Sequence, residues 1–171
     1  MRRELLLKTP RFEVLAETHR VGGREKKFYF VRKADATVVV AHTASKVLLL
    51  AVDRPVVREK SVELPGGRVE KGESPLRAAK RELWEEVGIA GRRWRLLGTT
   101  YPLPSLTTER VSIYTTHIDE HERIDGARGR GEGIRNARLV PYAVARRMLQ
   151  EGRLRCAVDS LALLQYFLTG Q

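Results

Sequence analysis

The chain of 171 residues has one cysteine, one asparagine, two methionines and no long apolar run. A single cysteine, Cys156, excludes an internal disulfide and favours a reducing compartment. No segment approaches the roughly 18 apolar residues of a membrane-spanning helix, and the leucines near the start form too short a run for a signal peptide. We therefore expect a cytoplasmic protein without membrane spans. The chain is long enough to bury a hydrophobic core without covalent cross-links.

Acidic residues are the minority, with 21 Asp and Glu against 32 Lys and Arg, and the net charge is +11. Residues 63–86 hold six acids and five bases, so the basic excess lies in the rest of the chain. A basic surround suits an anionic substrate that approaches bound cations, and it would also suit nonspecific RNA binding. Because asparagine, glutamine and methionine are scarce, the arginine-rich surface of a heat-stable, thermophilic protein is a third interpretation.

The order of the expected elements indicates an α/β fold. Extended segments at 12–18 and 27–33 flank a turn in which Gly22 and Gly23 supply positive φ, so an N-terminal antiparallel hairpin is expected. Continuous apolar runs at 36–41 and 46–52 predict buried strands.

Beyond these strands, residues 53–62 predict a polar connection. Three further strands are expected, at 94–100, 110–118 and 137–140, with polar loops at 101–109 and 119–133. Two helices are expected near the C-terminus, at 141–150 and 157–168. We expect the last helix to bury one apolar face, made of Leu161, Leu164, Phe167 and Leu168.

The most informative stretch is 64–89, LPGGRVEKGESPLRAAKRELWEEVGI, which predicts a glycine-rich turn followed by a helix. Ser74 is a suitable N-cap, Pro75 suits the first helical position, and Gly88 suits the C-terminal end. On this helix three acids share a face that spans about 100°; they are Glu82, Glu85 and Glu86.

This arrangement suits a divalent metal. Mg²⁺ prefers oxygen ligands, and two carboxylates one helical turn apart can share such ions. Gly66 and Gly67 lack side chains, so a backbone carbonyl can approach as a ligand. A metal that bridges phosphate oxygens promotes hydrolysis of a phosphoanhydride. Glutamates on an exposed helix usually form only surface ion pairs, so the argument depends on the complete spacing.

The spacing fits the pattern G-x5-E-x7-R-E-U-x-E-E-x-G-U without a miss, where U is a bulky apolar residue. It resembles the Nudix box of the Nudix hydrolases. The resemblance implies an α/β/α sandwich with a mixed sheet, and Mg²⁺- or Mn²⁺-dependent hydrolysis of a nucleoside diphosphate linked to another group. It also implies roles for the matching residues: metal ligands at Gly66 (carbonyl), Glu82, Glu85 and Glu86; catalytic roles for Arg81 and Glu85; and structural support from Gly67, Glu73 and Gly88.

Outside the box, the chain resembles the ADP-ribose pyrophosphatase subgroup. PLPSLTTERVSIY carries Pro104 fifteen residues beyond the box, and VGGREKKFYFVRK resembles the subgroup's extra N-terminal sheet. This resemblance implies substrate-binding residues at Arg54, Glu63 and Pro104. It also implies two parts, with residues 1–35 as antiparallel strands for homodimerisation and residues 36–171 as the hydrolase domain.

The subgroup also has a late glutamate, acting as catalytic base or extra metal ligand. In GRGEGIRNARLVP the matching residue is Glu132. The chain departs from the pattern two residues earlier, where a second acid is usual and Arg130 stands. Glu120 and Glu122 therefore remain alternatives for the base.

The leading hypothesis is hydrolysis of ADP-ribose or a related ADP-sugar to AMP and a sugar phosphate. The first alternative is an NTP or dinucleoside polyphosphate pyrophosphohydrolase. The second is an RNA-binding or decapping-associated module that uses the basic surround, although an intact set of box acids argues against a purely binding role.

Overall fold

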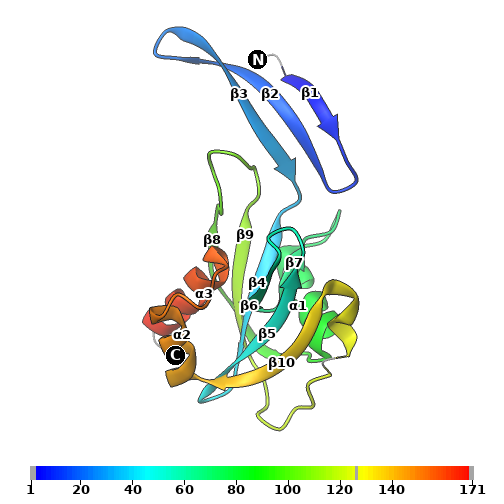
Figure 1. The fold of residues 1–171 in the computed structure, drawn as a ribbon, viewed down its shortest axis with the longest axis vertical. Helices are drawn as coiled ribbons and strands as arrows, with labels where there is room; N and C mark the ends of the chain where they lie inside the picture. Colours follow the sequence, from blue (N-terminus) through cyan, green and yellow to red (C-terminus); the bar gives the residue numbers. More distant parts are fainter. Residues whose placement is uncertain (1–2, 126, 170–171) are drawn as a thin grey trace.

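The computed structural model describes residues 3–125 and 127–169, and contains two β-sheets with helices packed on the larger one (Figure 1). The smaller sheet is antiparallel and is formed by β1 (Arg3–Lys8), β2 (Phe12–Val21) and β3 (Arg24–Lys33). Its β2–β3 pair is the predicted hairpin, and Gly22 and Gly23 adopt φ of 59° and 80° in the turn. A two-residue turn that matches strand twist needs positive φ at both positions. β1 adds a third strand to the predicted pair.

The larger sheet has seven strands. Its main path runs β10-β5-β4-β9-β8, while β6 pairs with β5 and β7 pairs with β4. The β4–β9 pair is parallel and the other pairs of this sheet are antiparallel, so the sheet is mixed. The strands are β4 (Ala36–His42), β5 (Lys46–Arg54), β6 (Glu59–Glu63), β7 (Gly66–Arg68), β8 (Arg92–Thr100), β9 (Val111–His117) and β10 (Ile134–Pro141).

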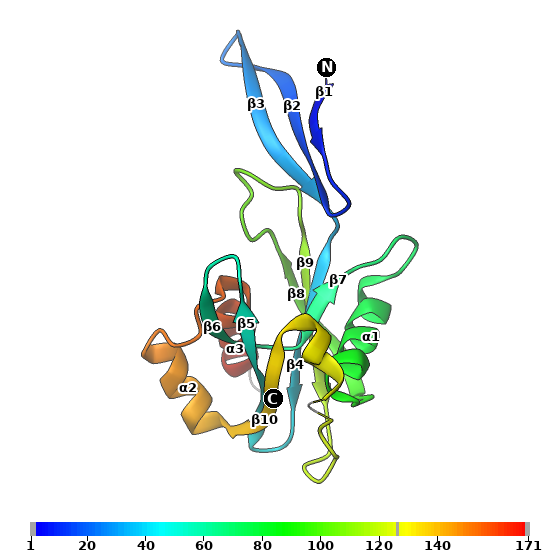
Figure 2. The same ribbon diagram turned by 45° about the vertical axis from the view of Figure 1, so that its right-hand side comes forward.

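Helices cover both faces of the larger sheet (Figure 2). One face carries α1 (Pro75–Val87), and the other carries α2 (Tyr142–Gln150) and α3 (Ala157–Leu168). Along β4, Val39 packs in the cluster on the α1 side and Val40 in the cluster on the α2 and α3 side. Because both faces are buried, the strand sequence is continuously apolar rather than alternating. The α/β/α sandwich implied by the sequence is confirmed.

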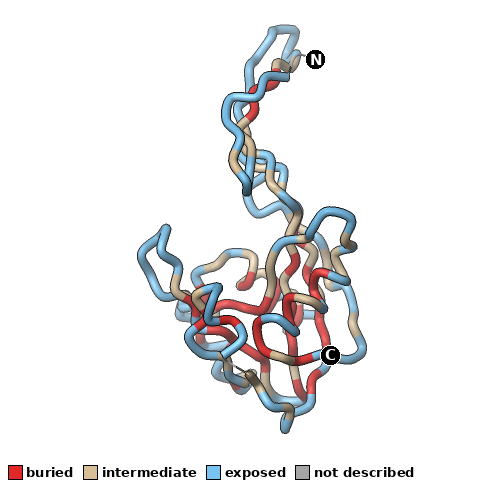
Figure 3. Tube along the Cα trace, turned by 90° about the vertical axis from the view of Figure 1, so that its right-hand side faces the viewer, coloured by how far each residue is buried: buried red, intermediate tan, exposed pale blue. Residues whose placement is uncertain are grey.

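The smaller sheet projects away from this core, and most of it is exposed (Figure 3). It is joined to the larger part by backbone hydrogen bonds of Val31, whose amide donates to the Leu106 carbonyl at 2.7 Å and whose carbonyl accepts from Thr108 at 3.1 Å. None of the helices formed by the described residues is long and apolar enough to cross a membrane.

Two expectations are wrong, one for residues 53–62 and one for the buried face of α3. Residues 53–62 are not a simple connection, because β5 continues to Arg54 and β6 pairs with it as a hairpin. The turn is closed by the Arg58 amide, which donates to the Pro55 carbonyl at 3.2 Å. A strand built mainly of polar residues lacks the apolar alternation by which strands are recognised.

The predicted face of α3 is also wrong in part. Leu164 and Leu168 are 46% and 82% exposed, and the buried residues are instead Asp159, Ala162, Leu163 and Tyr166. Because the helix is apolar on nearly every side, apolar spacing alone does not select the face that packs. Tyr166 lies inward, with its hydroxyl 2.8 Å from that of Tyr142.

Candidate active site

The ends of α1, which carries the acids of the site, are as predicted. The Ser74 hydroxyl accepts from the Arg77 amide at 3.3 Å, and Pro75 opens the helix. At the other end Gly88 adopts φ of 74° and donates its N–H to the Trp84 carbonyl at 2.9 Å. Glycine reaches this left-handed conformation without steric cost, so the helix ends cleanly at the predicted residue.

Three carboxylates meet beside α1. Glu82 and Glu86 lie one helical turn apart and are 6% and 5% exposed. Glu132 joins them from η1 (Arg128–Glu132), a short 3-10 helix. One oxygen from each residue lies within 4.8 Å of the other two, and no other group of three potential metal ligands occurs among the described residues. Glu85 is about half exposed and pairs with Arg81 at 2.9 Å.

The two glycines of β7 bring backbone close to these carboxylates. The Gly66 amide donates to Glu86 Oε2 at 3.0 Å. A Cβ on Gly66 would lie 2.2 Å from the Thr37 carbonyl oxygen, and a Cβ on Gly67 would lie 2.3 Å from Glu82 Oε1. Any side chain at either position would therefore displace β4 or the carboxylate itself.

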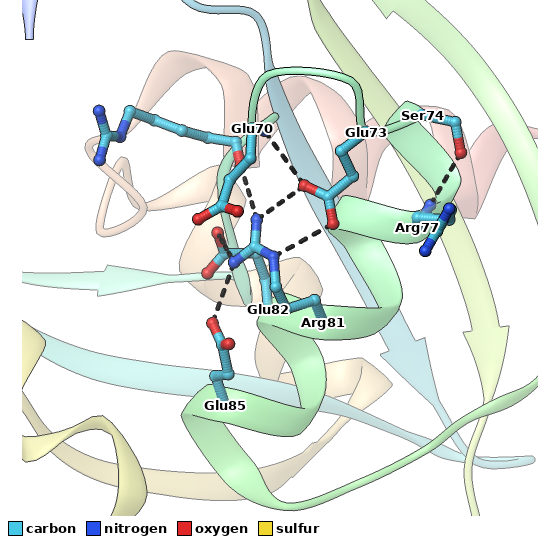
Figure 4. Close-up of polar contacts among 8 residues, drawn as sticks. Glu70, Glu73, Ser74, Arg77, Arg81, Glu82 and Glu85 are labelled. Carbon is cyan, nitrogen blue, oxygen red and sulfur yellow. Dashed lines mark hydrogen bonds and ion pairs between the residues drawn. The ribbon is translucent and has the colours of Figure 1, made fainter.

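Arg81 connects the remaining acids of the box (Figure 4). Its guanidinium donates to Glu73 at 3.2 and 3.1 Å, to Glu82 at 2.8 Å and to Glu85 at 2.9 Å. It also donates to the Arg68 carbonyl at 2.8 Å. All five donors of the planar guanidinium are thus used, a geometry that a lysine does not reproduce. These five hydrogen bonds join three acids of the box to the backbone of β7.

The electrostatics of the cluster favour a bound cation. The pKa of Glu86 is raised to about 9, mainly by burial and also by the negative charges of Glu82 and Glu132, although the hydrogen bond from the Gly66 N–H lowers it. Burial also raises the pKa of Glu82, against the Arg81 hydrogen bond. Buried carboxylates are costly as anions unless a cation compensates them. An all-oxygen donor set of three carboxylates with one neighbouring guanidinium fits Mg²⁺ or Mn²⁺.

Glu132 reaches the cluster because its segment docks on the C-terminal end of α1. The guanidinium carbon of Arg128 stacks 4.6 Å from the centre of the Trp84 ring. A Cβ on Gly88 would lie 3.2 Å from Arg128 Nε, so the glycine also leaves room for this docking. Trp84 stands where the box pattern allows any residue. Its stack with Arg128 therefore helps to hold the segment that carries Glu132.

The two alternative late acids lie elsewhere. Glu120 pairs with Lys46, which lowers the pKa of the Glu120 carboxyl. Glu122 accepts from the Asp119 amide at 3.4 Å. Neither belongs to the carboxylate group beside α1, so the structure places only Glu132 there.

The carboxylates line a cleft of about 1120 Å³ that extends to the smaller sheet, where Arg11 and Lys33 contribute to its wall. Arg54 and Glu63 also line it, as a bidentate ion pair in which Arg54 Nε lies 2.8 Å from Glu63 Oε1. Pro104 does not line this cleft and is exposed in the loop after β8. Nine of the residues predicted for the site line this cleft: Arg54, Glu63, Gly66, Gly67, Arg81, Glu82, Glu85, Glu86 and Glu132. Glu73, Gly88 and Pro104 do not line it.

Sequence reasoning missed three contacts. The Arg68 carbonyl accepts a hydrogen bond from Arg81, and the Trp84 ring stacks with Arg128; residue type alone predicts neither contact. Asp159 of α3 is 3% exposed, and its Oδ2 accepts from the Leu64 amide at 3.3 Å. The available indication was a lone acid within the otherwise apolar helix sequence AVDSLALL.

Comparison with known proteins agrees with this fold. Residues 31–160 match the NUDIX domain family. The chain is 31% identical over 108 residues to the ADP-ribose pyrophosphatase of Bacillus subtilis, covering 60% of this chain and 58% of that protein. It is 30% identical over 114 residues to the methanol dehydrogenase activator of Bacillus methanolicus, covering 60% and 62%. A solved structure described as an ADP compounds hydrolase superposes with a TM-score of 0.80 at 19% identity, covering 99% of this chain and 91% of that one.

The chain therefore belongs to the NUDIX domain family. Within the family it is similar to ADP-ribose pyrophosphatase, as the residues outside the box indicated, so both predictions of relationship are confirmed. The chain spans less than two thirds of the length of the two curated relatives, and the solved structure supports the fold.

Proposed function

We propose that this protein hydrolyses the pyrophosphate bond of ADP-ribose or a related ADP-sugar, giving AMP and a sugar phosphate, with Mg²⁺ or Mn²⁺ as cofactor. The observation that carries the proposal is the group of Glu82, Glu86 and Glu132 on one wall of a large cleft. Two of these carboxylates are buried, and among the residues that the structure describes Glu86 has only the Gly66 N–H as its hydrogen-bond partner. Similarity to the ADP-ribose pyrophosphatase of Bacillus subtilis supports the substrate class.

In this proposal Glu82, Glu86 and the Gly66 carbonyl hold the metal, with Glu85 as a further ligand or water-orienting acid. A bound divalent cation supplies positive charge to the diphosphate and makes water more acidic. Glu132, which is exposed to the cleft, accepts the proton of the water that attacks phosphorus.

Other residues of the chain position these groups and the substrate. Arg81 acts by holding Glu82 and Glu85 in place through its hydrogen bonds. Arg54 is aimed at the substrate by its bidentate pairing with Glu63, which is 8% exposed. A planar guanidinium suits recognition of phosphate oxygens.

A homodimer formed through the smaller sheet is part of the proposal. Leu5, Leu7 and Tyr29 of this sheet are 53%, 50% and 58% exposed. A second copy would cover these side chains, and it would allow the loop of Pro104 to reach the substrate of its partner. Light scattering at micromolar concentration tests the dimer, and a monomeric mass would contradict it. The single cysteine suits the cytoplasmic location that we infer.

The test of the activity is a substrate screen with identified products. Purified protein and Mg²⁺ are incubated with ADP-ribose, other ADP-sugars, NADH, dinucleoside polyphosphates and NTPs, and the products are separated by chromatography. We expect AMP and ribose phosphate from ADP-ribose, and no turnover by a Glu82→Gln control. Fast NTP turnover without ADP-ribose turnover would instead support the alternative pyrophosphohydrolase. RNA binding that falls steeply with salt and survives Glu82→Gln would support the binding module.

A further inference from the structure

We propose that Asp159 is a positioning residue, which holds the turn at residues 64–66 so that the carboxylates beside α1 bind a divalent cation. The inference rests on the proposed metal site, and it assigns a role in that site to α3, on the opposite face of the sheet. Asp159 is 3% exposed and lies in the first turn of α3. It accepts a hydrogen bond from Leu64, directly before Pro65 and Gly66.

Each residue of this turn is attached to a different element. The Leu64 amide donates to Asp159 of α3 at 3.3 Å. The Pro65 carbonyl accepts from the Val39 amide of β4 at 2.8 Å. The Gly66 amide donates to Glu86 of α1 at 3.0 Å. The turn is therefore hydrogen-bonded to both helical layers and to the sheet between them.

The Asp159 attachment has no ready substitute. Leu64 is 4% exposed and packs in the core on the α2 and α3 side, so water does not freely replace the carboxylate as acceptor. A buried N–H without an acceptor is destabilising, and the turn would relieve this by moving. Movement of Leu64 displaces Gly66 two residues later, and with it the donor that orients Glu86.

Asp159 also faces the pair expected to bind substrate. Burial raises the pKa of the Asp159 carboxyl to about 7, and the negative charge of Glu63 raises it further, while Arg54 and the hydrogen bonds from Leu64 and Cys156 oppose the rise. The same side chain is thus close to Glu63, the residue before the turn. The hydrogen bond to Leu64 needs an acceptor oxygen and not a negative charge, so asparagine is expected to replace aspartate in this role.

The test compares metal binding and stability in three variants of the full chain. Asp159→Ala removes the acceptor, and Asp159→Asn keeps it. Leu163→Ala is the matched control, because Leu163 is a fully buried α3 residue of the core. Mn²⁺ binding without substrate is measured from the electron paramagnetic resonance signal of free Mn²⁺, and unfolding is measured by urea denaturation. If Asp159→Ala does not fold, Asp159→Ser replaces it, since its shorter side chain keeps a polar group in the helix but withdraws the acceptor from the Leu64 amide, and the same loss of Mn²⁺ affinity is expected.

We expect Asp159→Ala to weaken Mn²⁺ binding about tenfold, the order of one lost hydrogen bond, with Asp159→Asn close to wild type. Leu163→Ala should lose stability but keep its Mn²⁺ affinity. Wild-type affinity in Asp159→Ala, or equal weakening in Leu163→Ala, would overturn the positioning role. The activity proposal fails separately, if wild-type protein binds Mn²⁺ but does not hydrolyse ADP-ribose.

Discussion

Replacing Glu86 with glutamine should stabilise the metal-free protein while removing its proposed activity. Glu86 is 5% exposed, and its carboxyl has a pKa of about 9 in the folded protein against an ordinary value of 4.5. Between these two values the folded state binds a proton that the unfolded chain has released, so folding loses stability as pH rises. Glutamine does not titrate, and its amide oxygen can keep the 3.0 Å hydrogen bond from Gly66.

The magnitude follows from the difference in pKa. Each pH unit above the unfolded pKa lowers the free energy of unfolding by about 1.4 kcal/mol, until the pH reaches the folded pKa. The gain from Glu86→Gln is therefore about 3 kcal/mol at pH 7 and about 6 kcal/mol near pH 9. Below the unfolded pKa both states carry the proton, and this electrostatic difference vanishes.

The assay is urea denaturation in EDTA from pH 5 to pH 9, with Glu85→Gln as the control. Glu85 lies on the same helix but is about half exposed, so its variant controls for the loss of a helical carboxylate without the burial. Adding Mg²⁺ should stabilise the wild type but not Glu86→Gln, and ADP-ribose turnover should fall by several orders of magnitude in that variant. A Glu86→Gln protein that is no more stable than wild type at pH 8, or whose gain in stability does not change with pH, would refute this effect of burying Glu86.

Three further substitutions test other parts of the site. Gly67→Ala places a Cβ 2.3 Å from Glu82 Oε1 and should weaken Mn²⁺ binding by about tenfold or more in a folded protein; unchanged affinity by titration would contradict the packing argument. Arg81→Lys loses most of the five hydrogen bonds, and should lower kcat about a hundredfold and the melting temperature by several degrees in kinetics and calorimetry. Normal kcat would show that the carboxylates need no such support. Trp84→Ala removes the stack with Arg128, worth about 0.5–1 kcal/mol, and should lower kcat more than Mn²⁺ affinity, with partial recovery in Trp84→Phe. Equal activity of wild type, Trp84→Ala and Trp84→Phe would show that the stack does not position Glu132.

The box was predictable because its geometry is local. Ser74, Pro75 and Gly88 define a helix by their own backbone preferences, and helical periodicity then places Glu82 and Glu86 one turn apart. The buried strands of the larger sheet were predictable for a related reason, since a run of apolar residues needs burial on both faces.

Elements without such a local pattern were missed or assigned wrongly. β6 is a polar strand recognisable only by its pairing with β5. The buried face of α3 was misjudged because the helix offers apolar residues on several sides. The face that packs also carries Asp159 and Tyr166, whose side chains hydrogen-bond with Leu64 and Tyr142.

The sequence by itself therefore determined the family, the turn–helix motif and its acidic residues, because these depend on spacing within a short stretch. The tertiary structure decided which late acid joins them: Glu132 lies beside α1, whereas Glu120 pairs with Lys46. It also decided that Asp159, far along the chain, contacts the turn before Gly66. Such contacts arise from the packing of the two helical layers across the sheet, and residue type alone does not specify which buried donor an acceptor will meet.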